Sequence, residues 1–220
     1  MLPFMTEGGA VPSGALYYDV DNAVKAIIKR KPQDIAKTAG IAFDDKNSCF
    51  TFPSLSQSIT VTHPDYKVTF TGTEKTPVAN WLMPVLHYLS IADGFPLSGN
   101  LVPFRYINEH TAHPDNFEKE TGESLLIFFD GKPQDKLRKA CEAIGGELLK
   151  GSGDIYARFD FLPRLPIFFK FWYSDDETPG SCKFLFDEKC IHYLDEMDVQ
   201  MCGPLLAGFI ISQYKLTELI

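Results

Sequence analysis

The chain has 220 residues, of which 45% are hydrophobic and 23% charged, a composition typical of a globular protein with a substantial core. Its net charge of −8 argues against nucleic-acid binding, because phosphate recognition needs a clustered basic surface. No apolar run is long enough to span a membrane, and the first residues lack the pattern of a signal peptide. The five cysteines include no CxxC pair, which favours free thiols in a reducing cytoplasm.

The first part of the chain predicts a lead-in and a helix. Residues 1–16 are rich in Gly and Pro and are expected to be loosely held, so a single domain is predicted over residues 17–220. Asp19 or Asp21 can cap the first helix. Its apolar positions share one face at helical spacing: Val20, Ala23, Val24, Ile27 and Ile28.

A short helix and a β-meander are predicted next. Residues 32–39 fit a helix that begins with Pro and stops at Gly40. Three segments then alternate between apolar and polar residues, which indicates antiparallel strands with one buried face. These segments are Cys49–Phe52, Ser58–Thr62 and Tyr66–Thr71, and their inward residues would be Phe50, Phe52, Ile59, Val61, Val68 and Phe70.

The central region predicts mainly helices. A helix that opens at Thr76-Pro77 has Pro84 inside it, and the proline ring must kink the helix or mark its true start. Two more helices are predicted between Pro114 and Gly145. Within them, the apolar run Leu125–Phe129 also fits a buried strand, so its type stays open.

The last third combines strands with a helix. Asp154–Phe161 and Leu165–Tyr173 alternate as two strands around a Pro-bounded turn, and Cys182–Phe186 supplies a third. A helix that starts at Asp195 or Asp198 would cover a sheet face. Two groups of strands, with helices between and after them, predict an α+β fold. In this fold helices, including a C-terminal one, pack on one face of antiparallel sheets.

The acidic run after the aromatic strand is a candidate metal site. Successive side chains alternate on a strand, but in a turn Asp175, Asp176 and Glu177 can converge and offer oxygen ligands to Mg²⁺ or Ca²⁺. The alternative is a solvated acidic turn without a ligand. In either case Arg105 or Arg164 can pair with one of the acids.

Cysteine and histidine residues give weaker signals. Cys182, Cys190, His192 and Cys202 lie close in sequence, but their spacing matches no standard zinc site, so buried thiols are expected. A lone helix histidine is usually partly buried with a hydrogen-bond partner, and a histidine pair needs a third metal ligand. His87 is such a lone histidine in the predicted helix. His110 and His113 form such a pair, and the sequence offers no third ligand for it.

Aromatic residues crowd the predicted C-terminal strands. They are expected to be mainly core, and any that face outward would form an apolar wall for a flat cofactor or a partner. The residues are Phe159, Phe161, Phe168, Phe169, Phe171, Trp172 and Tyr173.

Motifs spread along the chain form one ordered pattern. The C-terminal motifs are Leu162-Pro-Arg-Leu-Pro166, Trp172, Asp176-Glu177, Pro179, Leu185-Phe-Asp187 and Tyr193-Leu194 with a following acidic pair. The upstream motifs are His87-Tyr88-Leu89, the Gly94–Gly99 loop, Phe104-Arg105, Gly145-Gly146 and Gly153-Asp154. Together they resemble the uncharacterised family called domain of unknown function 3786, over about residues 20 to 215.

The resemblance implies a setting and a set of candidate ligand-binding residues, without catalytic roles. The family occurs in anaerobic bacteria and archaea, and some members carry an iron–sulfur module like that of corrinoid iron–sulfur proteins. This chain lacks the cluster-binding cysteines, and a Tyr-Ile-Asn-Glu-His loop replaces the expected Gly-containing turn after Phe104-Arg105, which weakens a ligand role there. The positions carried over are Arg105, Asp154, Arg164, Trp172, Asp176, Glu177 and Asp187.

Three functional interpretations follow. The first is a non-enzymatic cytoplasmic domain of anaerobic corrinoid or one-carbon metabolism, which binds a cofactor of unknown identity or a partner protein of a corrinoid or iron–sulfur system. The second is an enzyme in which Asp175, Asp176 and Glu177, with Asp187 as a further ligand, hold a divalent cation and Arg105 orients an anionic substrate. The third is a structural role, in which Arg–carboxylate pairs close the sheet edge.

Overall fold

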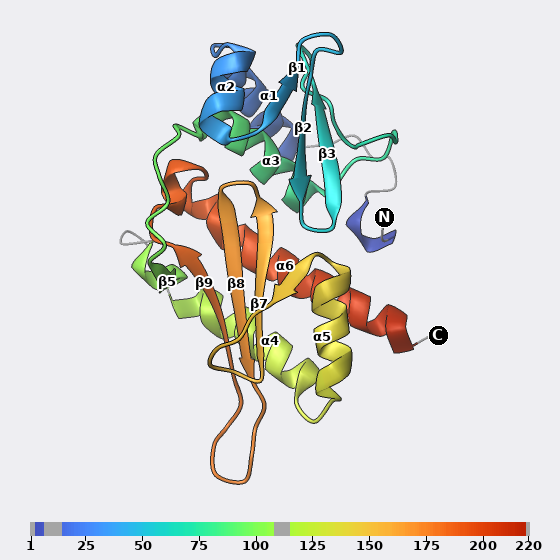
Figure 1. The fold of residues 1–220 in the computed structure, drawn as a ribbon, viewed down its shortest axis with the longest axis vertical. Coiled ribbons are helices and arrows are strands. Elements are labelled where there is room, and N and C mark those ends of the chain that lie inside the picture. Colours follow the sequence, from blue (N-terminus) through green and yellow to red (C-terminus); the bar gives the residue numbers. More distant parts are fainter. Residues whose placement is uncertain (1–2, 7–14, 108–114, 219–220) are drawn as a thin grey trace.

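The computed structural model describes residues 3–6, 15–107 and 115–218, which form an α+β fold with two antiparallel sheets around one hydrophobic core (Figure 1). The four-stranded sheet has the order β1-β2-β3-β4 and belongs to the N-terminal part of the chain. The elements of this part are α1 (Ala15–Ile27), α2 (Pro32–Ala39), β1 (Ala42–Asp44), β2 (Cys49–Ser54), β3 (Gln57–Thr62), β4 (Val68–Phe70) and α3 (Ala79–Ile91).

The five-stranded sheet belongs to the C-terminal part and has the order β5-β9-β8-β7-β6. Its strands are β5 (Leu101–Pro103), β6 (Gly146–Leu148), β7 (Ile155–Leu162), β8 (Leu165–Trp172) and β9 (Ser181–Asp187). The helices of this part are α4 (Asp115–Phe129), α5 (Gln134–Ala143) and α6 (Glu196–Glu218). Short 3-10 helices are η1 (Pro3–Met5), η2 (Phe104–Tyr106) and η3 (Cys190–His192).

The four-stranded sheet buries the face that its alternation predicts. All six predicted inward residues are buried, and they pair across the strands, for example Phe50 with Val61 and Ile59 with Phe70. Helix α3 packs on this face, where the Trp81 ring lies 5.5 Å from the ring of Phe70. The periodicity therefore identified both the strands and the side that faces the core.

The five-stranded sheet also has one buried face, and its strands contact α4 and α5, which in turn pack against α6. The buried and outward residues alternate along β8, so Phe169 and Phe171 point inward while Phe168 and Trp172 are only half-buried. Figure 1 views the sheet from its outer side, with α4 and α6 behind β7, β8 and β9. This outer face has no helix over it in the described part of the chain.

Backbone hydrogen bonds join the two halves of the fold. The β2–β3 turn donates to the second half, from Leu55 N to Asp160 O at 2.8 Å and from Ser56 N to Ile144 O at 3.0 Å. Gly145 makes this approach possible, because it has φ +97° and a Cβ there would lie 2.5 Å from the Leu55 carbonyl carbon. The two sheets thus share a close main-chain contact as well as the core.

The structure corrects several boundaries. Helix α1 begins at Ala15 instead of Asp19 or Asp21, and Ile28 lies beyond its end and is exposed. The ambiguous run Leu125–Phe129 is the end of helix α4. Strands β1, β5 and β6, of three residues each, are absent from the predicted elements, because no alternating segment around them extends the pattern as Tyr66–Thr71 does for β4.

The described part of the predicted lead-in is attached to the fold. Met5 is buried, and its carbonyl accepts a hydrogen bond from Val78 N at 3.2 Å. The Phe4 ring lies 5.6 Å from the ring of Phe209 on α6. Residues 7–14 and the loop that holds His110 and His113 lie outside the described residues. No helix in the described segments is both long and apolar enough to cross a membrane.

Candidate functional site

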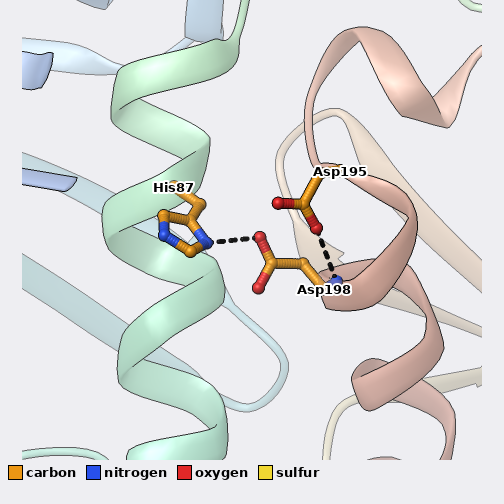
Figure 2. Close-up of side chains that lie close together, drawn as sticks. All are labelled: His87, Asp195 and Asp198. Carbon is orange, nitrogen blue, oxygen red and sulfur yellow. Dashed lines mark hydrogen bonds and ion pairs between the residues drawn. The ribbon is translucent and has the colours of Figure 1, made fainter. Parts of the chain in front are cut away.

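A histidine and two aspartates from α3 and the start of α6 come together where the two halves of the fold meet. The Nδ1 atom of His87 lies 2.6 Å from the carboxylate of Asp198, and the carboxylate of Asp195 lies beside them (Figure 2). One ligand atom of each side chain lies within 4.8 Å of the others. Within the described ranges, this is the one group of three or more His, Cys, Asp or Glu side chains that meets this criterion.

Local sequence signals place these carboxylates. Asp195 precedes α6, and its Oδ1 accepts a hydrogen bond from Asp198 N at 2.8 Å, which is the contact of a helix N-cap. Asp198 lies in the first turn, where the helix dipole favours an acid. The side chains differ in exposure, because Asp198 is only 8% exposed, His87 is 23% exposed and Asp195 is exposed.

The helix that carries His87 is fixed at its C-terminal end. The guanidinium of Arg30 donates to the carbonyls of Leu89 at 2.8 Å, Ser90 at 3.0 Å and Ala92 at 2.7 Å. Burial lowers the pKa of Arg30, and this effect outweighs the nearby carboxylates of Asp34 and Asp93, which raise it. These bonds cap the last carbonyls of α3, so the helix cannot fray next to His87.

The acidic run predicted as a metal site lies in the turn between β8 and β9. Asp175 Oδ1 accepts hydrogen bonds from Glu177 N at 3.0 Å and from Thr178 N at 2.7 Å. These donors hold the pKa of the Asp175 carboxyl below its usual value. Asp176 and Glu177 are exposed, and neither forms an ion pair with a described residue. The three carboxylates do not form a compact ligand group in this conformation.

Asp187 faces a different loop. Its carboxylate is buried and accepts hydrogen bonds from Ser98 N and Oγ, each at 3.2 Å, from Gly99 N at 2.7 Å and from Lys189 N at 2.9 Å. It therefore holds the Gly94–Gly99 loop against the end of β9. This contact brings together two motifs of the family-like pattern, but it directs Asp187 away from the acidic turn.

The two arginines of the candidate set lie on separate elements. Arg164 is exposed in the β7–β8 turn, and its backbone N donates to the Tyr88 hydroxyl at 3.1 Å. Its guanidinium lies over Gly40, where a Cβ would be 2.9 Å from Arg164 Nε. Arg105 is exposed in η2, with its guanidinium carbon 5.0 Å from the centre of the Tyr106 ring.

Asp154 and Trp172 lie together at one end of β7 and β8. Asp154 Oδ2 accepts a hydrogen bond from Tyr173 N at 2.8 Å, and its backbone N donates to Phe171 O at 2.9 Å. Trp172 is half-buried on the outer face of the sheet. Of the seven candidate residues, these two are therefore near neighbours, while Arg105, Arg164, Asp187 and the acidic turn occupy other places.

The outer face around Trp172 combines aromatic and basic side chains. Lys170 and Lys183 are direct cross-strand neighbours on β8 and β9. Lys170 Nζ lies 4.4 Å from the centre of the Tyr156 ring and donates to Ser152 Oγ at 3.0 Å, and Lys183 Nζ lies 5.9 Å from the centre of the Trp172 ring. Neither lysine forms an ion pair with a described residue.

The cysteines match the expectation of free thiols, and all five are free. Cys190 and Cys202 are buried, whereas Cys182 is only partly buried. Burial raises the pKa of the Cys190 thiol to about 12 and also raises the pKa of Cys202. Both thiols therefore stay protonated and unreactive at neutral pH.

His192 binds Asp93 in an arrangement separate from the cysteines. Its Nδ1 lies 2.7 Å from the Asp93 carboxylate, and its ring stacks on Phe95 at 4.1 Å. Burial alone would raise the pKa of Asp93, but hydrogen bonds from His192 and from Phe95 N hold it below its usual value.

The His87 group was not predicted as a site. His87 fitted the description of a lone helix histidine, and Asp195 and Asp198 fitted that of a helix start. No spacing rule connects residues 111 positions apart. The one available signal was that His87 and the acidic pair after Leu194 both belong to the motifs of the family-like pattern.

Comparison with known proteins gives one match. The family model described as domain of unknown function (DUF3786) matches residues 31–208. No curated protein and no solved structure matches this chain.

Proposed function

The chain belongs to the DUF3786 family, whose function is unknown, and we propose that it is a binding domain for a planar anionic ligand. The binding surface is the outer face of the five-stranded sheet around Lys170, Lys183 and Trp172. The single observation that carries this proposal is the direct cross-strand pairing of two lysines that have no acidic partner among the described residues.

The lysine pair is unfavourable without an anion. Like charges directly opposite each other on neighbouring strands repel, by a few tenths of a kcal/mol up to about 1 kcal/mol. The repulsion is local, since the chain as a whole carries a net charge of −8. A carboxylate, sulfonate or phosphate group that bridges both ammonium groups would remove the repulsion and gain two charge-assisted hydrogen bonds.

Aromatic rings beside the lysines suit a flat ligand. Trp172 and Phe168 are half-buried on the same face, and the Tyr156 ring lies 6.2 Å from that of Phe168. The loop that carries Gly151 closes over Tyr156, where a Cβ on Gly151 would lie 2.7 Å from the ring. Rings of this kind stack on planar groups, so the ligand class is a planar aromatic or conjugated molecule with an acidic substituent.

Quenching of tryptophan fluorescence tests the charge on this surface. Trp81 is fully buried, so ionic quenchers reach Trp172 alone. We expect iodide to quench Trp172 more strongly than caesium at equal ionic strength, despite the negative net charge. The double variant Lys170→Gln, Lys183→Gln should abolish this difference. Lys46→Gln, an exposed lysine in the turn between β1 and β2, serves as the control that leaves it unchanged.

Titration with the planar anion 8-anilino-1-naphthalenesulfonate tests binding. We expect the double lysine variant to bind it about tenfold more weakly, as is typical for loss of a hydrogen bond to a charged group. Trp172→Ala should weaken binding to a similar degree, whereas Lys46→Gln should not. Equal affinity of the double variant and the unaltered protein would overturn the proposal.

Two finer interpretations stay predictions from the sequence. One is a protein partner in an anaerobic corrinoid or iron–sulfur system, which depends on the resemblance alone. The other is a metal-dependent enzyme at Asp175, Asp176 and Glu177 with Arg105. The geometry favours a site on the outer sheet face over a metal site in the acidic turn, because backbone N–H groups already donate to the Asp175 carboxylate.

A further inference from the structure

We propose that His87, Asp195 and Asp198 bind one divalent transition-metal ion between α3 and α6. This inference is independent of the outer sheet face, because it depends on different residues on different elements. The ion would lie at the junction where α6 packs against α3, and it would cross-link the two halves of the fold.

The geometry requires only a small movement. Two ligand atoms at about 2.1 Å from a tetrahedral ion lie about 3.4 Å apart. His87 Nδ1 and Asp198 Oδ2 are 2.6 Å apart, so they would separate by less than about 1 Å. The Asp195 carboxylate is already within 4.8 Å of both. His87 would bind through Nδ1 in the tautomer that carries its proton on Nε2.

The charges favour a dication. Asp195 and Asp198 place two carboxylates within one helical turn, and Asp198 is buried, where an ionised acid is costly unless it is compensated. The N-terminus of α6 opposes a cation with about half a positive charge, but the two carboxylates outweigh it. A divalent ion carries enough charge to neutralise both acids at once, whereas a protonated His87 supplies a single positive charge.

The donor set selects the class of ion. One imidazole nitrogen with two carboxylate oxygens suits Zn²⁺, Mn²⁺, Fe²⁺ or Co²⁺ better than Ca²⁺ or Mg²⁺, which prefer oxygen ligands alone. Three protein ligands leave at least one coordination position for water or another small ligand. Cys202 lies one turn after Asp198 and is buried, and its sulfur is not part of the ligand group.

The competing explanation is purely structural. The Asp195 cap and the His87–Asp198 hydrogen bond would stabilise α6 and tie it to α3 without any ion. The two explanations differ at Asp195. Its cap needs only one acceptor oxygen, which asparagine also provides, whereas a metal site needs its negative charge. Asp195→Asn therefore separates the cap from the ligand.

Titration of the purified, metal-free protein with Co²⁺ is the experiment. We expect one equivalent to bind, with visible d–d bands and without the thiolate-to-cobalt absorption that a cysteine ligand would give. At an excess of about 100-fold over the dissociation constant, the ion should raise the melting temperature by about 5–10 °C. Asp195→Asn should weaken binding at least tenfold while the melting temperature of the metal-free variant stays within about 2 °C of the unaltered protein.

Asp44→Asn is the matched control, because Asp44 is also an exposed acid that accepts backbone N–H groups, from Lys46 at 2.8 Å and from Asn47 at 3.1 Å. It should leave Co²⁺ affinity and the thermal shift unchanged. His87→Gln should abolish the shift, and it tests the nitrogen ligand separately from the acids. The proposal is wrong if Co²⁺ does not bind, if Asp195→Asn binds it as well as the unaltered protein, or if the spectrum shows a thiolate ligand.

Discussion

The acidic turn between β8 and β9 and the His87 group both contain neighbouring carboxylates, yet their surroundings are opposite. In the turn, three consecutive acids lie in water, and backbone N–H groups from the turn itself satisfy Asp175. In the His87 group, the acids are three residues apart on a helix start, and the third side chain comes from α3. Here Asp198 is buried and depends on a partner that is distant in sequence.

The difference shows what makes a cluster of acids chemically useful. Adjacent acids in an exposed turn can separate freely, so their charges are screened and cost little. Acids on a helix start that packs against another helix are held in place, and here the imidazole of His87 lies 2.6 Å from the Asp198 carboxylate. Convergence from separate rigid elements is therefore a stronger sign of a site than closeness in sequence.

The largest effect is expected for His87→Leu. This change leaves the buried Asp198 carboxylate without its 2.6 Å partner, and removal of one member of a buried pair costs on the order of 3 kcal/mol. Asp176→Ala in the exposed turn should change stability by less than about 0.5 kcal/mol. Urea unfolding at neutral pH measures both. Similar values for the two variants would remove the contrast between the regions.

A smaller effect is expected for Asp187→Asn. The amide presents donors where Ser98, Gly99 and Lys189 also donate, so at least one N–H group loses its acceptor. We expect a loss of about 2 kcal/mol, the usual cost of an unsatisfied buried polar group. Glu188→Gln, at a partly exposed neighbour that accepts from Asn100, is the control. Unchanged urea stability of Asp187→Asn would show that the loop is not held by this carboxylate.

Most of the fold follows from local patterns in the sequence. Alternation was enough to predict β2, β3, β7 and β8 as strands, and for β2 and β3 it also predicted the buried face, because the side-chain period of a strand is fixed by its backbone. The helix at residues 32–39 was predicted with its end at Gly40, which adopts φ +66°. The short edge strands β1, β5 and β6 escaped prediction because their pairing depends on neighbours and not on their own sequence, whereas the short edge strand β4 lies within the predicted segment Tyr66–Thr71.

Much less of the candidate site could be predicted. Asp187 looked like a fourth acid for a metal, but its role as an acceptor for the Gly94–Gly99 loop requires contacts across 88 and 89 positions. Trp172 was identified as a candidate, and the alternation of β8 does place it outward. The pairing of Lys170 with Lys183 depends on the register of β8 and β9, which no single-strand pattern gives.

The smallest expected effect is a shift in the pKa of Asp175. It bears directly on the comparison, because the sign of the shift reports whether the acids of the turn lie close together. Hydrogen bonds from Glu177 N and Thr178 N lower the pKa of Asp175, so the carboxylate form is favoured in the folded protein. A lowered folded-state pKa contributes stability above the unfolded-state value, and this contribution is lost as the pH falls through the folded-state pKa. We expect carbon-detected NMR to give a midpoint below the usual value of about 3.9 for Asp. A raised midpoint would instead show that the charges of Asp176 and Glu177 converge on Asp175. The acidic turn would then concentrate charge as the His87 group does, and the metal-site prediction for that turn would regain support.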